Sequence, residues 1–196
     1  MNAKSKLQFS ALKNFSEIGY YESTTLQISK DAGLSEATLF RTFDNKEDLY
    51  YSTLTYYSDT SNLNFYPLLS NLTFNDIQFD LTQITEFIVD TYISRIHMTR
   101  ILISNLIQVK SIREHHSLVI SEIHSFLMNY FVEMNIRNLI CSLDYDTIAN
   151  SIISCILYEI TQETVFNKKV DFTKKDKEKI INKINSTLDV ICLFLL

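Results

Sequence analysis

The chain has 196 residues, a net charge of −5 and 46% hydrophobic residues, but only two glycines and one proline. Because hairpin turns and β-bulges depend on glycine and proline, this composition argues against a β-rich fold and predicts helices joined by polar loops. No run of about 18 apolar residues appears, and the N-terminus lacks the apolar stretch of a secretory signal, so we expect a cytoplasmic protein without a membrane partner. The length fits a small module attached to a larger one.

The cysteines and histidines offer no convincing metal or redox site. Cys141, Cys155 and Cys192 have no C-x-x-C spacing and lie among apolar residues, so we interpret them as reduced core residues rather than ligands. Adjacent His115 and His116 would point about 100° apart on a helix and could not easily share one metal. The sequence also lacks a glycine-rich phosphate loop, an H-E-x-x-H motif and a nucleophile–base arrangement. We therefore expect no metal, no cofactor and no catalytic residues.

Helix signals begin at once in the N-terminal segment. Apolar residues at helical spacing predict a helix over residues 4–18, and Gly19 follows where a helix C-terminus favours a left-handed residue. A second helix of about two turns should follow Ser23, Thr24 and Thr25, whose hydroxyls are good N-cap groups. It should stop at Gly33.

Two more short helices follow without a long loop. Ser35 can cap a third helix over residues 36–43, and Asn45, with Asp48 three residues later, can cap a fourth. Three short helices with a glycine-containing turn between the second and third predict a helix-turn-helix, in which the third helix would lie in the major groove of DNA. From this pattern alone, a generic three-helix subdomain stays an alternative.

Ordered residues across positions 7–50 resemble the signature of the TetR (tetracycline-repressor) family. They are Ala11, Phe15, Gly19 and Tyr20; then Thr24, Thr25, Leu26, Ile28, Ser29, Ala32, Gly33, Leu34 and Ser35; then Thr38, Leu39, Phe40, Phe43, Lys46, Glu47 and Leu49. The resemblance implies an all-α, homodimeric bacterial transcription regulator of about nine helices. A three-helix helix-turn-helix DNA-binding domain would occupy residues 1–51, with the motif at about 24–43. A larger helical ligand-binding and dimerisation domain would occupy residues 52–196.

The third helix must supply the groups that meet DNA. Arg41 could pair bidentately with guanine or clamp a phosphate, and a threonine could bond a phosphate or touch a thymine methyl. The alternative interpretation is that Arg41 and the threonines lie on an ordinary solvated helix surface and contact no DNA. The residues expected to contact DNA are Thr24, Thr25, Ser35, Glu36, Ala37, Thr38, Phe40, Arg41, Thr42 and Lys46.

The chain departs from the family at two of these positions. The position of Phe40 is commonly a tyrosine whose hydroxyl reaches a phosphate, and the position of Glu36 is often basic. A carboxylate here would be repelled by phosphate unless it accepts from a cytosine amino group. Thr25 and Lys46 match family phosphate-contact positions. Residues 1–51 carry six basic and seven acidic groups, so composition alone does not favour DNA binding.

Later helices are expected at about residues 76–96, 99–109, 112–134, 146–166 and 173–196, after a loop around Pro67. The resemblance implies that the fourth helix links a ligand pocket to the DNA-binding domain. Aromatic and polar residues that could line this pocket, although most such aromatics simply form core, are Tyr56, Tyr57, Phe87, Tyr92, His97, Phe126, Tyr130 and Tyr158. Their mixture suggests a largely apolar small-molecule effector.

The last two predicted helices carry continuous apolar stripes. Two such helices per subunit could form a four-helix bundle across a two-fold axis, with an interface made of Ile152, Ile156, Ile180, Ile184, Leu188, Ile191 and Leu195. Together with these stripes, the resemblance implies a homodimeric repressor that a small ligand releases from double-stranded operator DNA. A helical ligand-binding or protein-interaction module without DNA binding is the alternative, and the acidic N-terminal segment favours it.

Overall fold

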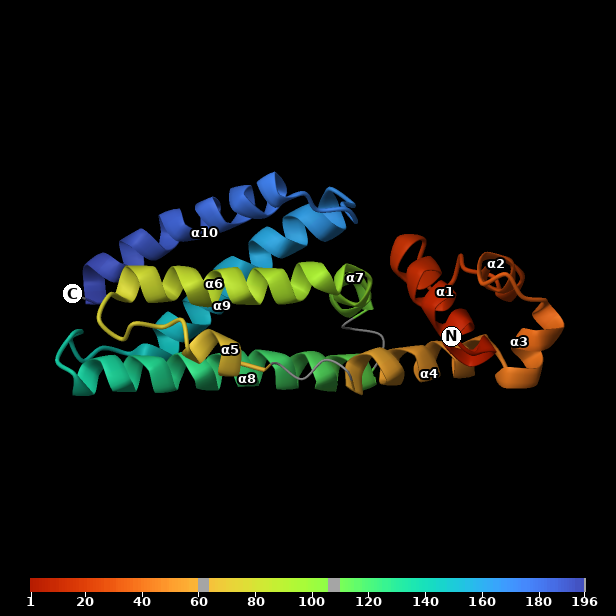
Figure 1. Ribbon diagram of the computed structural model, residues 1–196, viewed down its shortest axis with the longest axis horizontal. Coiled ribbons are helices and arrows are strands. Elements are labelled where there is room, and N and C mark those ends of the chain that lie inside the picture. The colour runs from red at the N-terminus through yellow and green to blue at the C-terminus, as the bar shows by residue number, and fades with distance from the viewer. Residues whose placement is uncertain (60–63, 106–109, 196) are drawn as a thin grey trace. The chain divides into compact units, whose positions relative to one another are not determined.

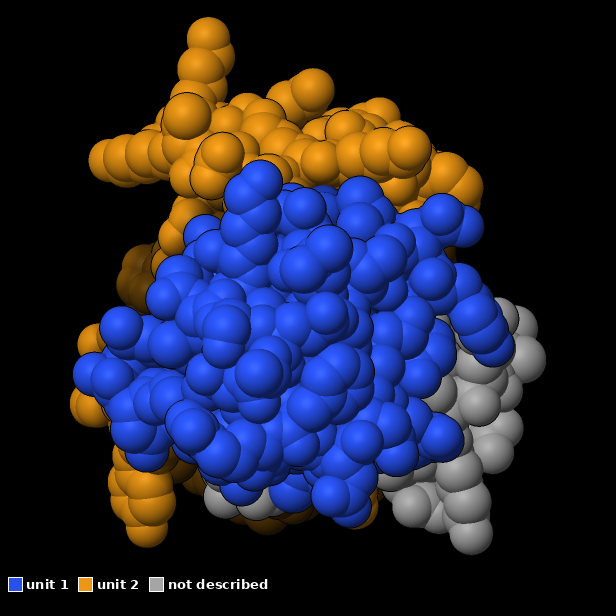
Figure 2. Space-filling model, turned by 90° about the vertical axis from the view of Figure 1, so that its right-hand side faces the viewer, with its two compact units in different colours: residues 1–62, 97–113 blue, residues 63–96, 114–196 orange. Residues whose placement is uncertain are grey.

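A computed structural model describes residues 1–59, 64–105 and 110–195. Every regular element in these residues is a helix, and the chain separates into two compact units (Figures 1 and 2). Unit 1 consists of residues 1–62 and 97–113, and unit 2 of residues 63–96 and 114–196. The predicted all-α fold is thus confirmed. Among the described helices, none combines the length and apolar character needed to cross a bilayer.

Unit 1 contains the four predicted N-terminal helices and one later helix. These are α1 (Ala3–Glu17), α2 (Thr25–Asp31), α3 (Glu36–Thr42), α4 (Lys46–Asp59) and α7 (Ile96–Asn105). The predicted caps are confirmed, because Thr24, Ser35 and Asn45 each accept a hydrogen bond from the backbone N–H three residues later. Gly19 and Gly33 adopt the left-handed region, with φ of 88° and 68°, which glycine alone enters without strain.

One apolar core holds unit 1 together. Its buried residues are Leu7, Ala11, Leu12, Phe15, Ile28, Leu39, Phe43, Leu49, Tyr50, Leu54, Met98 and Ile101. Met98 and Ile101 come from α7, and His97 Nδ1 lies 2.7 Å from Ser16 Oγ of α1. α7 therefore completes this core although it follows α4 by many residues. The domain boundary predicted after residue 51 stays a prediction, since α4 runs through that position.

Unit 2 contains the remaining helices. They are α5 (Tyr66–Leu69), α6 (Ile77–Ser94), α8 (Lys110–Ile136), α9 (Tyr145–Thr161) with a π-helical turn η1 (Gln162–Phe166), and α10 (Lys174–Leu195). Figure 1 shows α6 and α10 side by side and antiparallel. Gln78 Nε2 donates to Asp189 Oδ1 at 2.7 Å near one end of this pair, and Lys177 bonds Asp90 near the other.

The described residues form ten α-helices, one more than the nine or so expected. The extra helix is α5, which has four residues and carries Pro67 in its first turn. A segment this short shows no periodicity, and proline there marks a helix start only when the following residues continue the helix.

The predicted dimer interface stays a prediction, but most of its residues are already buried within their own chain. Ile152, Ile156, Ile180, Ile184, Leu188 and Leu195 are each at most 2% exposed within the single chain, and only Ile191 is half-buried. Side chains already covered by their own subunit cannot cover a partner. Their stripe instead packs α10 against α6 and α9. The exposed apolar residues of α10 are Val190, Leu193 and Phe194, at 53%, 77% and 71%.

Candidate nucleic-acid interface

α2 and α3 are joined by a tight turn that fixes their relative direction. The N–H of Gly33 donates to the carbonyl of Lys30 at 3.0 Å, and the N–H of Leu34 donates to that of Ser29 at 2.9 Å. Ile28 of α2 and Leu39 of α3 are fully buried and anchor the two helices in the same core. The opposite faces of both helices therefore point away from that core, as a helix-turn-helix requires.

The outer face of α3 carries one cation and one aromatic ring. Ala37, Phe40 and Arg41 are exposed, Phe40 at 51%. Arg41 takes part in no ion pair within the part of the chain that the structure describes. Its guanidinium is thus available for a base edge or a phosphate. Phe40 has no hydroxyl, so it can offer only apolar contact.

Several hydroxyls near α3 already have hydrogen-bond partners. Thr42 donates to the carbonyl of Thr38 at 2.8 Å, and Ser35 and Thr38 share a hydrogen bond at 2.9 Å. Each hydroxyl carries one proton, so the Ser35–Thr38 pair retains one donor and Thr42 retains none while its bond lasts. Thr24 accepts at the N-terminus of α2 and keeps its own proton.

Glu36 and Thr25 connect the first residues of α3 and α2. The hydroxyl of Thr25 donates to Glu36 Oε1 at 2.6 Å, and both residues are half-buried. While this bond lasts, Thr25 has no proton for a phosphate. The phosphate contact predicted for Thr25 stays a prediction, and it requires the bond to Glu36 to open.

Lys46 is also engaged within unit 1. Its ammonium donates to the carbonyl oxygens of Tyr20 at 2.8 Å and Ser23 at 3.0 Å, and lies 3.4 Å from that of Tyr21. It also stands 4.4 Å from the ring centroid of Tyr20. These contacts tie the start of α4 to the turn between α1 and α2. The predicted phosphate contact of Lys46 is untested and competes with them.

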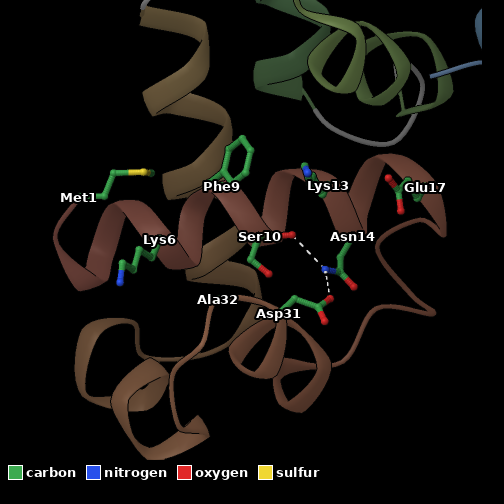
Figure 3. Close-up of a pocket in the computed structure, with 9 residues that line it drawn as sticks. All are labelled: Met1, Lys6, Phe9, Ser10, Lys13, Asn14, Glu17, Asp31 and Ala32. Carbon is green, nitrogen blue, oxygen red and sulfur yellow. Dashed lines mark hydrogen bonds between the residues drawn. The ribbon is translucent and has the colours of Figure 1, made fainter. Parts of the chain in front are cut away.

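A hollow of about 510 Å³ lies along α1 beside the end of α2 (Figure 3). Asn14 crosses it, donating to the carbonyl of Ser10 and to Asp31 Oδ2, both at 3.0 Å. Lys6 and Lys13 supply positive charge and Glu17 and Asp31 negative charge. Because the two signs are mixed, this hollow favours neither an anion nor a cation.

Unit 2 has a second hollow, of about 410 Å³, between the segment around α5 and the second half of α8. It is lined by Leu69, Leu72, Phe74, Phe126, Asn129, Tyr130, Glu133 and Arg137. Arg137 pairs with Glu133 at 2.7 Å and lies 5.1 Å from the ring centroid of Phe74. The site thus has an aromatic wall and a charged rim. This combination suits an apolar ligand with one polar group.

A buried carboxylate holds one wall of this hollow. Asp80 is fully buried on α6 and accepts from the N–H groups of Thr73 at 2.7 Å and Phe74 at 2.8 Å, and from the Tyr130 hydroxyl at 3.1 Å. Burial and the neighbouring carboxylate raise the pKa of Tyr130 above its ordinary value. The tyrosine therefore stays a neutral donor, and the loop before α6 is fixed to α6 and α8.

The predicted pocket residues are spread over both units. Phe126 and Tyr130 line the hollow in unit 2, and the ring of Phe65 lies 4.3 Å from Phe126 and 5.4 Å from Phe87. The others are Tyr92, buried on α6; Tyr158, 59% exposed on α9; and Tyr56, Tyr57 and His97 in unit 1. Pocket lining stays a prediction for all of them. Phe74 and Arg137 also line the hollow but were not predicted, because neither belongs to an aromatic run on a predicted helix.

The N-terminal segment matches known bacterial regulators. Residues 10–52 match the tetR family of bacterial regulatory proteins. The HTH-type transcriptional regulator HbdR of Aromatoleum sp. (strain CIB) is 42% identical over 50 residues, which are 26% of this chain and 22% of that protein.

Solved structures resemble the whole described fold. A TetR transcription regulator from Haloarcula marismortui superposes with a TM-score of 0.70 at 13% identity, over 99% of this chain and 98% of that one. The fatty acid degradation regulator FadR of Bacillus halodurans gives 0.63 at 16% identity, over 96% and 95%. A regulator from Saccharomonospora viridis, solved in complex with choline, gives 0.70 at 16% identity, over 95% of both chains.

Proposed function

We propose that this TetR-type regulator, whose residues 10–52 match the tetR family of bacterial regulatory proteins, is a cytoplasmic, homodimeric repressor. Its operator binding would respond to a small, largely apolar ligand. The observation that carries the proposal is the helix-turn-helix in unit 1. Its second helix, α3, turns Arg41 and Phe40 away from the core. A helix of this kind reads base edges in the major groove.

In this proposal α3 enters the major groove and Arg41 pairs with a guanine or clamps a phosphate. Thr24 and the Ser35–Thr38 pair, which retain protons, donate to phosphates. Loss of an Arg41 base contact should cost about 1–3 kcal/mol and relax sequence preference. The test is genome-wide footprinting with the purified protein, followed by a gel shift of Arg41→Ala on the strongest site. Unchanged affinity and preference in Arg41→Ala would contradict this docking.

The homodimer is proposed to form through exposed residues rather than the buried stripe of α10. Val190 and Phe194 lie one turn apart on α10, and Leu193 lies beside them at 77% exposure. A cluster of large apolar side chains on a helix surface is typical of a covered interface. Sedimentation of Leu193→Asp should show a monomer. Ser186→Asp places the same charge on an exposed position of the same helix and should leave the dimer intact; dissociation of both, or of neither, would refute this interface.

The hollow beside α8 is the proposed effector site. The complex of the Saccharomonospora viridis regulator with choline supports a small-molecule site in this fold. An effector that changes operator affinity must show the reciprocal effect, typically 5–150-fold for a coupling of about 1–3 kcal/mol. A thermal-shift screen followed by titration into the protein–operator complex tests this. Phe126→Ala should remove ligand stabilisation, whereas Phe166→Ala, an exposed aromatic outside the hollow, should keep it.

A ligand-binding module without DNA binding is the second candidate. It is favoured by the engagement of Lys46 and Thr25 within unit 1, which leaves fewer donors for phosphates. Footprinting separates the two candidates. No protected site at low salt, from a protein that still binds a ligand, would favour this module.

A further inference from the structure

We infer that Glu36 reads a cytosine in the operator, and that Thr25 positions its carboxylate for this contact. The inference rests on the proposed function, because it assumes that α3 enters the major groove. It concerns the base that this chain selects. That selectivity follows from two side chains on one face of α3, Glu36 and Phe40, neither of which can donate a hydrogen bond to a phosphate.

The carboxylate of Glu36 is held at the start of the recognition helix. The Thr25 hydroxyl donates to Oε1 at 2.6 Å, and no described residue bonds to Oε2. This hydrogen bond restricts the rotation of the Glu36 side chain before DNA binds, so less side-chain entropy is lost when the complex forms. The second oxygen is therefore presented in a limited set of directions next to the exposed face of α3.

Electrostatics decides which group of DNA can approach this oxygen. A phosphate is repelled by a carboxylate, and Phe40, one turn further along the same face and 51% exposed, has no hydroxyl to anchor one. This face is consequently suited to base edges rather than to the backbone. A carboxylate only accepts hydrogen bonds, so its partner must be a donor.

The major groove contains two kinds of donor, the N4 amino group of cytosine and the N6 amino group of adenine. Adenine also presents the N7 acceptor next to its amino group, and a carboxylate that approaches both atoms would place two acceptors together. Cytosine itself presents no acceptor on its major-groove edge, so a carboxylate can approach the amino group from the side away from the O6 of the paired guanine. The acceptor-only chemistry of Glu36 therefore favours cytosine over adenine, as well as over guanine and thymine.

The test is selection of binding sites from a random DNA library with the wild-type protein and five variants. Wild type should retain a cytosine at one position of each half-site. Glu36→Gln, whose amide can both donate and accept, should shift that position toward adenine. Glu36→Ala should lose discrimination there by about 5- to 150-fold. The other positions should keep their preference.

Three further variants separate positioning from charge. Thr25→Val should weaken the cytosine preference although Glu36 is present, and Thr25→Ser, which keeps the hydroxyl, should restore it. Glu17→Gln removes one negative charge from an exposed site on α1 and should leave base preference unchanged. Circular dichroism confirms that each variant is folded.

The outcomes distinguish this inference from the proposed function. If wild type selects a motif and Glu36→Gln selects the same motif with the same discrimination at every position, Glu36 does not read a base and the inference is wrong. If Glu17→Gln changes the preference as Glu36→Gln does, the effect is one of net charge and the inference is again wrong. If wild type selects no sequence at all, the proposed function fails and takes the inference with it.

Discussion

Replacement of Lys46 by methionine removes the ammonium group but keeps a side chain of similar length. In the wild type this group donates to the carbonyls of Tyr20 at 2.8 Å and Ser23 at 3.0 Å and stands 4.4 Å from the ring centroid of Tyr20. A hydrogen bond from a charged group contributes about 1.5–3 kcal/mol when buried. An exposed cation–π contact contributes about 0.5–1 kcal/mol. Because Lys46 is only half-buried, we take the low end of both.

The expected loss is about 3.5 kcal/mol in the free energy of unfolding, since two bonds and one ring contact disappear together. For a chain of this length, this corresponds to a fall in Tm of about 7–14 °C. Thermal unfolding by circular dichroism measures it. The matched control is Lys30→Met, an exposed lysine in the last turn of α2, which should cost less than about 1 kcal/mol.

If Lys46 instead contacts a phosphate of DNA, its removal should change the salt dependence of operator binding rather than the Tm. A lysine that neutralises a phosphate contributes about 1 to the slope of log K against log salt, and its removal lowers that slope. Operator titrations at several salt concentrations, below the Tm of both proteins, measure this slope. If Lys46→Met lowered the slope by about 1 and left the Tm unchanged, the contacts of Lys46 with the turn would be negligible and our reasoning would be wrong.

Three further predictions concern the cores of the two units. Ile101→Ala opens a cavity where α7 packs into unit 1 and should destabilise that unit by about 2–5 kcal/mol. The amides of α1 and α4 should then exchange hydrogen faster. Unchanged protection of these amides would exclude α7 from this core. Asp80→Asn replaces one acceptor oxygen by a donor amide among the N–H and hydroxyl groups that Asp80 binds, and should lower the Tm by several degrees in calorimetry. An unchanged Tm would show that the loop before α6 does not need the hydrogen bonds to Asp80. Burial raises the pKa of Cys192 to about 11, so iodoacetamide at pH 8.5 should alkylate exposed Cys141 and spare Cys192 in the folded protein. Because the unfolded thiol ionises first, stability should fall as pH rises from about 8.5 towards that value, and Cys192→Ala should remove this slope.

Local signals in the sequence located the helices of unit 1 well. Thr24, Ser35 and Asn45 act as N-caps as predicted, because a capping oxygen reaches only the N–H groups two or three residues further on. Gly19 and Gly33 end helices in the left-handed region for an equally local reason. Hydrophobic periodicity likewise predicted α6, α8, α9 and α10 to within a few residues.

Long-range partners could not be predicted from the same signals. Lys46 satisfies carbonyls more than twenty residues earlier, and α7 completes the core of unit 1 with Met98 and Ile101. Neither contact leaves a local pattern in the sequence. The sequence around a lysine or along an amphipathic helix does not depend on which distant residue it contacts. For the candidate site, the sequence indicated which residues face outward but not which hydroxyls and charges already bind each other.

α10 shows that one apolar stripe is compatible with two different packing partners. Its most regular stripe, from Ile180 through Ile184 and Leu188, is what a dimer interface would show, but the same period is required to pack α10 on α6 and α9 within one chain. Hydrophobic periodicity indicates that one face of a helix is buried, but it does not indicate whether the same chain or a partner subunit covers that face. Once that stripe is assigned to the core, only the last two turns of α10 present large exposed apolar residues, Leu193 among them. The earlier outer face carries the charged residues Lys175, Glu178, Lys179 and Lys183, and Lys183 is paired with Glu159 at 2.8 Å. A contact along the full helix would have to desolvate these charges, so α10 can contribute to an interface mainly through its C-terminal end.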